Sequence, residues 1–284
     1  MRHFYLIANP SKEGTEPMAR QIGEYLINHG AACEGSPQLR RSEEAGYGYT
    51  DLTKIPEKTQ CVITLGGDGT LIQAARDLVQ LKLPLMGINM GTLGYLAQVS
   101  KEDALEPVLD ALLADNFRLE KRMMLDGSVA GLDQTRRGIA LNDIVLTRRD
   151  VMQVLKFQIF VNGEYFNEYT ADGMIVSTPT GSTAYNLSAG GPIVEPGAEL
   201  MVLTPICSHS LNARSIVLSG RDTVSIRVCG GDYQKQMAVF DGDEVMDISC
   251  EETLNISQSE SQTTLIKLKT GTFLDNLRSK MTRV

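Results

Sequence analysis

One short turn carries the residues most suited to chemistry: Gly66-Gly67-Asp68-Gly69, followed by Thr70. Apolar residues precede the turn, and apolar residues at helical spacing follow it, which predicts a buried strand, a glycine turn and a helix beginning at Thr70. Such a turn directs backbone N–H groups and the positive end of the helix dipole at the space above it. We therefore predict that Gly66, Gly67, Gly69 and Thr70 bind phosphate, with glycine allowing positive φ and close approach of the anion.

Asp68 is unexpected in a pure phosphate cradle, because a carboxylate repels phosphate. It is expected where a proton must be accepted, or a metal ion held, beside the phosphate. The alternative is structural: Asp caps helix N-termini well, so Asp68 would serve only as the N-cap of the following helix.

A second segment, Asp172–Pro192, is dense in Ser, Thr, Gly and Pro around one aromatic residue, Tyr185. Small hydroxyl groups beside one ring suit a site that hydrogen-bonds a base or a ribose and packs the ring against it. A rigid surface turn is the alternative interpretation.

A third candidate is the pair Asn142-Asp143, which interrupts an apolar run. An Asn beside a carboxylate can hold the two hydroxyls of a ribose, although such a pair more often marks a bulge or a turn. Arg148 lies just beyond the pair and is the basic residue we expect to reach a phosphate.

The elements that must position these residues change in type along the chain. Three β-to-α units in about the first hundred residues favour a parallel, Rossmann-like sheet with ligand loops at the carboxyl ends of its strands. From 117 to 268 the pattern is mostly of short period-two runs split by turn pairs, which is typical of antiparallel sheets. The turn pairs are Asn162-Gly163, Gly230-Gly231 and Asp241-Gly242.

These patterns predict an α/β N-terminal domain over 1–105, joined by a C-terminal helix at 270–284, and a β-rich domain of antiparallel sheets over 106–269. A helix is expected at 102–114, near the boundary. The charged stretch 38–58 is expected to be a surface loop or flap.

Composition excludes several classes of protein. The net charge of −8 over 284 residues disfavours a nucleic-acid partner. Five widely spaced cysteines without a CxxC pair indicate free thiols rather than a disulfide framework or a zinc site. The apolar N-terminal segment is too short for a signal peptide and no run suits a membrane span, so a cytoplasmic protein without a membrane partner is expected.

Four motifs, in order along the chain, resemble the NAD kinase family. GGDGT at 66–70, followed by LIQAAR, is shared more distantly with diacylglycerol-type lipid kinases and 6-phosphofructokinases. NMGTLGYL at 89–96, Asn142-Asp143 and DGMIVSTPTGSTAYNLSAGGP at 172–192 separate the NAD kinases from these. CSHSLNARSIV at 207–217 adds to a resemblance over nearly the whole chain, which is most specific at 176–185.

The resemblance implies an enzyme that phosphorylates the 2′-hydroxyl of the adenosine ribose of NAD, using ATP and a divalent metal ion (Mg, or Mn) to give NADP. It implies Asp68 as the proton acceptor with Gly69 beside it, and Asn142 and Asp143 on the ribose and adenine. It places Asp172 at the far end of the dinucleotide, and assigns no metal ligand. The remaining substrate contacts implied are Tyr95, Thr183, Ala184, Tyr185, Asn186, Leu187 and Ser188.

The resemblance also implies a dinucleotide bound between two domains, and a homo-oligomer, dimer or tetramer. The sequence departs from the family at Asp143, where Glu is usual, at Tyr95, where Phe is usual, and at Asp243, where Gln is common. Two alternatives remain: a lipid kinase with the same GGDG turn, and a non-catalytic nucleotide-sensing module. The first predicts an acyl-chain pocket or a membrane-facing patch, which the sequence does not plainly show, and Asp68 disfavours the second.

Overall fold

The computed structural model describes residues 1–36, 40–41, 48–91, 94–131, 134–149, 154–210, 212–229, 236–268 and 272–282. The chain divides into two compact units, which are described separately. The first unit contains the described residues of 1–42, 48–122 and 262–284, and the second contains those of 123–261. In this division the first unit extends to Arg122, and the domain boundary expected at 105 stays a prediction.

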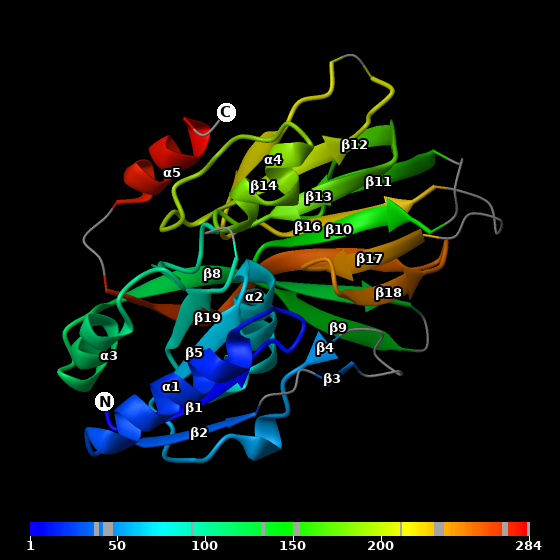
Figure 1. Ribbon diagram of the computed structural model, residues 1–284. Helices are drawn as coiled ribbons and strands as arrows, with labels where there is room; N and C mark the ends of the chain where they lie inside the picture. The colour runs from blue at the N-terminus through cyan, green and yellow to red at the C-terminus, as the bar shows by residue number, and fades with distance from the viewer. Residues whose placement is uncertain are drawn as a thin grey trace. The chain divides into compact units, whose positions relative to one another are not determined.

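The first unit is an α/β structure (Figure 1). Its helices are α1 (Thr15–Asn28), α2 (Asp68–Asp77), α3 (Leu105–Leu113) and α5 (Phe273–Met281), with short 3-10 turns η1 (Leu52–Lys54) and η2 (Val79–Leu81). Its strands are β1 (His3–Ala8), β2 (Ala32–Ser36), β3 (Arg40–Arg41), β4 (Gly48–Tyr49), β5 (Cys61–Gly66), β6 (Leu85–Asn89) and β7 (Val99–Ser100). The strands β8 (Arg118–Ala130) and β19 (Thr253–Lys267) each begin in one unit and end in the other.

The central sheet of the first unit is parallel, in the order β2-β1-β5-β6. All six residues of β5 are buried, as expected of a parallel strand covered on both faces. Helices α1 and α3 cover one face, where Ile22, Leu26 and Leu109 join the core around Ile63. Helix α2 covers the other face, where Leu71 lies so close to Gly87 of β6 that an added Cβ would meet it at 2.6 Å.

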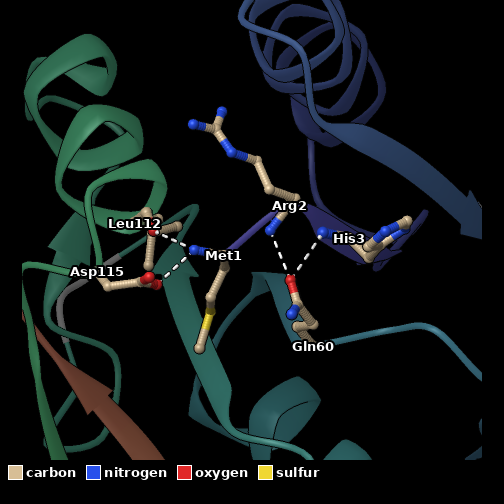
Figure 2. Close-up of polar contacts among 6 residues, drawn as sticks. All are labelled: Met1, Arg2, His3, Gln60, Leu112 and Asp115. Atoms are coloured by element: carbon tan, nitrogen blue, oxygen red, sulfur yellow. Dashed lines mark hydrogen bonds and ion pairs between the residues drawn. The ribbon is translucent and has the colours of Figure 1, made fainter.

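The start of β1 is fixed by contacts with two distant segments (Figure 2). The side-chain oxygen of Gln60 accepts the N–H groups of Arg2 at 2.6 Å and His3 at 3.2 Å. The Met1 amino group donates to Leu112 O at 3.2 Å and pairs with the Asp115 carboxylate. The carboxyl end of α3 is thereby tied to the first strand of the sheet.

The second unit is built from strands joined mostly by hairpins. Its elements are β9 (Thr135–Ala140), β10 (Asp143–Arg148), β11 (Leu155–Val161), β12 (Glu164–Ala171), β13 (Gly173–Ser177), η3 (Gly181–Thr183), α4 (Tyr185–Ser188), β14 (Leu200–Ile206), β15 (Ile216–Ser219), β16 (Val224–Val228), β17 (Gln236–Phe240) and β18 (Glu244–Ile248). One antiparallel sheet has the order β15-β14-β13-β10-β17-β18, and β12-β11-β16-β19 forms a second antiparallel run.

Alternating side chains of the two sheets form the main core of the second unit. Ile144 and Leu146 of β10 and Phe157 and Ile159 of β11 belong to it. On the opposite face of the first sheet, Val145 of β10 packs in a smaller cluster with Ile175 and Ile206. A parallel N-terminal sheet and antiparallel C-terminal sheets confirm the predicted fold class.

Two of the predicted turns are confirmed by their backbone. Asn162 and Gly163 between β11 and β12 have φ of 52° and 82°, and Asp241 and Gly242 between β17 and β18 have φ of 50° and 76°. Two residues of positive φ match the right-handed twist of a hairpin. The third predicted turn, Gly230-Gly231, lies outside the described residues.

Several smaller predictions have mixed outcomes. The C-terminal helix is confirmed as α5, where Thr272 and Asp275 form a capping box. The predicted loop at 38–58 includes the paired strands β3 and β4 and the turn η1, while 38–39 and 42–47 lie outside the described residues. All five cysteines lie among the described residues and are free thiols, as predicted. Among the described helices, none is long and apolar enough to cross a membrane.

Candidate active site

The glycine turn connects β5 to α2, but its details differ from the prediction. Strand β5 ends at Gly66 and α2 begins at Asp68, two residues before the expected start at Thr70. Gly67 is the N-cap residue, with φ −104°, and the helix has no side-chain cap. None of the turn glycines has positive φ, and Asp68 does not act as the N-cap.

The glycines serve close packing on one side of the turn and leave open space on the other. An added Cβ at Gly66 would lie 2.2 Å from Thr70 Oγ1, whereas one at Gly67 or Gly69 would meet no atom of the described residues within 4 Å. The Thr70 hydroxyl is buried and accepts a hydrogen bond from Asn9 Nδ2 at 3.0 Å. The backbone N–H of Thr70 donates to Gly67 O at 3.0 Å. Thr70 therefore supports the turn from inside, and its predicted contact with phosphate stays a prediction.

The Asp68 carboxylate is held by consecutive backbone amides of the loop after β6. Oδ2 accepts from Tyr95 N at 2.7 Å and Leu96 N at 3.3 Å, and Oδ1 accepts from Ala97 N at 3.1 Å. A carboxylate has about four acceptor positions, so these three bonds leave one position on Oδ1. The arrangement fixes the orientation of the Asp68 side chain and leaves it able to accept one more hydrogen bond.

Gly94 makes this arrangement possible. A Cβ at Gly94 would lie 2.0 Å from Asp68 Oδ2, closer than any atoms pack without a shift. The next residue, Tyr95, is half-buried, and Lys280 Nζ lies 4.5 Å from the centre of its ring. Of the 89–96 motif, Thr92 and Leu93 lie outside the described residues.

Asn142 and Asp143 stand at the start of β10 in the second unit. The Asp241 carboxylate accepts the N–H groups of Leu141 at 2.8 Å, Asn142 at 2.7 Å and Asp143 at 3.2 Å. Asn142 Oδ1 is buried and has no hydrogen-bond partner among the described residues. An unpartnered buried acceptor is costly unless something binds it, so this oxygen is available to a water molecule or a ligand.

Asp143 is a buried carboxyl group, with 4% of its surface exposed. Burial, and then the neighbouring charge of Asp241, raises the pKa of Asp143 to about 7. Both effects disfavour the ionised form. Its proton can therefore exchange near neutral pH, where an ordinary aspartate is fully ionised.

Arg148 and Asp172 lie at the other end of the β10–β13 pair. In the register of the two strands, Asp143 faces Ser177 and Thr147 faces Gly173. Arg148 pairs with Asp172 through Nη1 and Oδ1 at 3.3 Å. At ~3.4 Å per residue, this pair lies about 17 Å along the strand from Asp143. Arg148 therefore already pairs with a carboxylate, and its predicted contact with a phosphate stays a prediction.

The segment after β13 divides into exposed and buried residues. Tyr185 is 46% exposed and Leu187 is 38% exposed, while Thr183 and Ala184 are half-buried and Ser188 is exposed. Burial, followed by the negative groups of Cys207, Asp143 and Asp172, raises the pKa of Tyr185. Its ring therefore lies within electrostatic range of both ends of β10.

The side chain of Asn186 is already bonded within its own loop, and its predicted contact with the substrate stays a prediction. Asn186 is fully buried. Its Nδ2 donates to Ser182 O at 3.1 Å and Pro192 O at 3.0 Å, and its Oδ1 accepts from Thr204 Oγ1 at 2.7 Å. Asn186 holds the loop in shape, and its exposed neighbours are available to a substrate.

The predicted residues are thus divided between the two units. Asp68, the glycine turn and Tyr95 belong to the first unit. The second unit contains Asn142, Asp143, Arg148, Asp172 and residues 183–188. Sequence reasoning missed the supporting roles of Gly94 and Asp241. Asp241 was recognised only as part of a turn, because an Asp-Gly pair is a common turn signal. Among the described residues, no group of three or more His, Cys, Asp or Glu could hold a metal ion.

Comparison with known families gives matches over most of the chain. A family model described as the ATP-NAD kinase N-terminal domain matches residues 4–117, and the ATP-NAD kinase C-terminal domain matches 141–268. An NAD kinase of Lachnospira eligens is 40% identical over 294 residues, covering 99% of this chain and 100% of that protein. An NAD kinase of Agathobacter rectalis is 40% identical over 284 residues, covering 99% of each.

Solved structures show the same fold. The crystal structure of yeast NADH kinase complexed with NADH has a TM-score of 0.84 and 25% identity, covering 100% of this chain and 87% of that one. An NAD kinase from Archaeoglobus fulgidus in complex with ATP has a TM-score of 0.75 and 24% identity, covering 100% of both chains. These relatives support neither the lipid kinase nor the nucleotide-sensing alternative.

Proposed function

The chain belongs to the NAD kinase family, and from this premise we propose that it transfers the γ-phosphoryl group of ATP to the 2′-hydroxyl of the adenosine ribose of NAD. The products are NADP and ADP. The observation that carries the proposal is the placement of Asp68: a carboxylate in the first turn of α2, fixed by three backbone amides, with one acceptor position left on Oδ1.

Asp68 acts as the proton acceptor in this proposal. The ribose oxygen forms a bond to the γ-phosphorus, and the bond from that phosphorus to the bridging oxygen of ADP breaks. The hydroxyl proton passes to Asp68 Oδ1. Because the transition state of phosphoryl transfer is loose, positioning and charge neutralisation contribute more than covalent help from the protein.

The phosphates of ATP would lie above Gly67 and Gly69, where the turn leaves open space. The first N–H groups of a helix have no partner inside it, and they favour an anion at this position. A divalent ion, Mg or Mn, would neutralise phosphate charge when bound. Since Mg²⁺ is usually held by substrate phosphates with one or two carboxylates, the absence of a dedicated ligand cluster among the described residues fits an ion that arrives with ATP.

NAD would be held by residues of the second unit. The free acceptor Oδ1 of Asn142 suits an amine or hydroxyl of the adenosine moiety, and Asp143 beside it suits the ribose. Asp172, about 17 Å along the strand, suits the far end of an elongated dinucleotide. Thr183, Ala184, Tyr185, Leu187 and Ser188 supply surface between these ends.

We further propose a cytoplasmic homo-oligomer, a dimer or a tetramer, without a nucleic-acid partner. Five free thiols fit a reducing compartment. Exposed Tyr165 and Phe166, 58% and 43% accessible on β12, fit a surface covered by another subunit. The net charge of −8 disfavours nucleic acid.

The direct test incubates the purified protein with NAD, ATP and MgCl₂ and measures NADP with an NADP-specific coupling enzyme. Parallel reactions replace NAD with NADH or diacylglycerol, ATP with polyphosphate, or Mg with Mn. We expect NADP to form with ATP, and none to form when the metal is chelated. Lipid phosphorylation without NADP would favour a lipid kinase, and binding of NAD without turnover would favour a sensing module.

A further inference from the structure

We propose that Asp241 is a positioning residue for the NAD site: its carboxylate sets the backbone of Asn142 and Asp143 so that their side chains meet the substrate. The inference rests on the proposed function, since it concerns the same substrate. Asp241 lies about a hundred positions along the chain from the pair whose backbone it holds.

Four hydrogen bonds of Asp241 converge on one segment, residues 141–143. Its Oδ2 accepts from Leu141 N at 2.8 Å, and its Oδ1 accepts from Asn142 N at 2.7 Å and Asp143 N at 3.2 Å. The N–H of Asp241 donates to Asp143 O at 3.0 Å. Four hydrogen bonds from one residue thus hold backbone groups of three consecutive residues.

The hairpin turn directs the carboxylate at this segment. Ile144 pairs with Phe240 in the ladder between β10 and β17, so Asp241 is the first residue beyond the ladder. Its φ of 50° is left-handed, a conformation that turns the chain away from the strand and that Asp and Asn tolerate better than most residues.

The opposite side of the segment is clamped by the loop after β13. Thr178 N donates to Asn142 O at 2.8 Å, and Thr178 Oγ1 donates to Leu141 O at 2.7 Å. Gly181 packs so closely that an added Cβ would lie 2.1 Å from Asn142 O. The peptide groups of Leu141 and Asn142 are therefore bonded on both sides, and the buried oxygen Asn142 Oδ1 is the acceptor left for a ligand.

A carboxylate suits this position better than its isosteric amide. Three N–H donors converge on it, and bonds to an ionised acceptor are about twice as strong as neutral ones. Asn has a single acceptor oxygen, and its NH₂ group would face a donor. Because Asn also tolerates the left-handed backbone, Asp241→Asn removes the carboxylate without forcing a new turn conformation.

Asp222 offers a matched control in the same unit. Its carboxylate also stabilises a turn, accepting Ser219 N at 2.9 Å and Asn162 Nδ2 at 2.8 Å, but none of its contacts involves the Asn142 segment. Asp222→Asn should therefore affect stability alone.

The test compares steady-state kinetics, NAD affinity by calorimetry and melting temperature for the parent, Asp241→Asn and Asp222→Asn. We expect Asp241→Asn to raise KM for NAD tenfold or more with a smaller change in kcat, because contacts made in ground and transition states alike mainly change KM. KM for ATP should stay within twofold, and NAD affinity should weaken by the same factor as KM rises. Asp222→Asn should leave both KM values within twofold.

A second variant keeps the test informative if Asp241→Asn does not fold. Thr178→Val removes the hydroxyl hydrogen bond to Leu141 O on the opposite side of the segment and should also raise KM for NAD, by a smaller factor. Thr178→Ser keeps the hydroxyl and should return KM for NAD to the value of the parent. An unchanged KM for NAD in both Asp241→Asn and Thr178→Val, or an equal rise for NAD and ATP, overturns the inference. A parent that forms no NADP refutes the proposed function instead, a result that is distinct because it appears before any variant is compared.

Discussion

Asp68 has two roles that its contacts separate: it anchors the loop after β6, and it is the proposed proton acceptor. The anchor uses three acceptor positions, and the chemistry needs the fourth. Any substitution at Asp68 changes both the loop anchor and the proposed base, so the melting temperature of each variant must be measured together with its kcat.

Asp68→Asn should lower kcat about a hundred- to ten-thousand-fold, the usual effect of losing a general base. NAD affinity by calorimetry should change only a few-fold, because Asn can still hydrogen-bond the ribose hydroxyl and most of the proposed NAD contacts lie in the second unit. Asp77→Asn is the control, since Asp77 lies on the same helix and accepts Thr50 N at 2.6 Å. Activity of Asp68→Asn within a few-fold of the parent would leave Asp68 with the anchoring role alone.

Asp143 should make stability depend on pH near neutrality. In the unfolded chain an aspartate titrates near pH 3.9, whereas burial and Asp241 raise the pKa of Asp143 to about 7 in the folded protein. Between pH 4 and 7 the folded state binds more protons, so stability falls as pH rises, by about 4 kcal/mol over the whole window.

Asp143→Asn removes this titration, and its side chain keeps nearly the same size. We expect the melting temperature of the parent to fall relative to that of the variant between pH 4 and pH 7.5, with little further change above that. Scanning calorimetry at half-unit intervals measures the difference. A difference that stays constant over the range would contradict a raised pKa for Asp143.

At the scale of elements, the position of Asp68 depends on two segments: helix α2, which carries it, and the loop that follows β6, which binds its carboxylate. Gly94 lets the loop reach the Asp68 carboxylate, because an added Cβ would lie 2.0 Å from it. In the same loop, a Cβ at Gly91 would meet, among the described residues, only Asn89 Oδ1, at 3.9 Å, an ordinary contact. The two glycines therefore form a matched pair of test positions.

Gly94→Ala should displace Asp68 and lower kcat at least tenfold, while Gly91→Ala should remain close to the parent. Neither glycine has positive φ, so backbone strain does not distinguish them. Initial rates at saturating NAD and ATP, with melting curves as a check of folding, measure the effect. Equal activity of the two variants would show that the loop can move without affecting Asp68.

At the scale of the whole molecule, each unit has a separate proposed task, with the turn and base in the first and the NAD contacts in the second. Assembly is the further property at this scale. Tyr165 and Phe166 are exposed on β12, which lies at the end of its sheet. An exposed aromatic edge strand of this kind is commonly covered by another chain.

Light scattering at micromolar concentration should give a mass of two or four times the chain mass of 31.1 kDa. Tyr165→Glu should shift the distribution to smaller species, because a buried charge opposes association, while Leu119→Glu, at an exposed residue on β8, should not. A parent that is monomeric would refute the proposed assembly.

The sequence by itself determined the features that depend on neighbouring residues. The buried strand and helix around Asp68 follow from hydrophobic periodicity, and the hairpins at Asn162-Gly163 and Asp241-Gly242 follow from residues that tolerate positive φ. The motifs also indicated the family, because they occur in a fixed order over most of the chain.

Only the tertiary structure decided what each polar side chain contacts. Asp68 binds amides 27 to 29 positions away, and Asp241 binds amides 98 to 100 positions away. The same holds for Asn186, whose amide is buried in the loop, and for Arg148, which is paired with Asp172. Local pattern carries no signal for such pairings, because they depend on which strands and loops the packed fold brings together rather than on the period of one element.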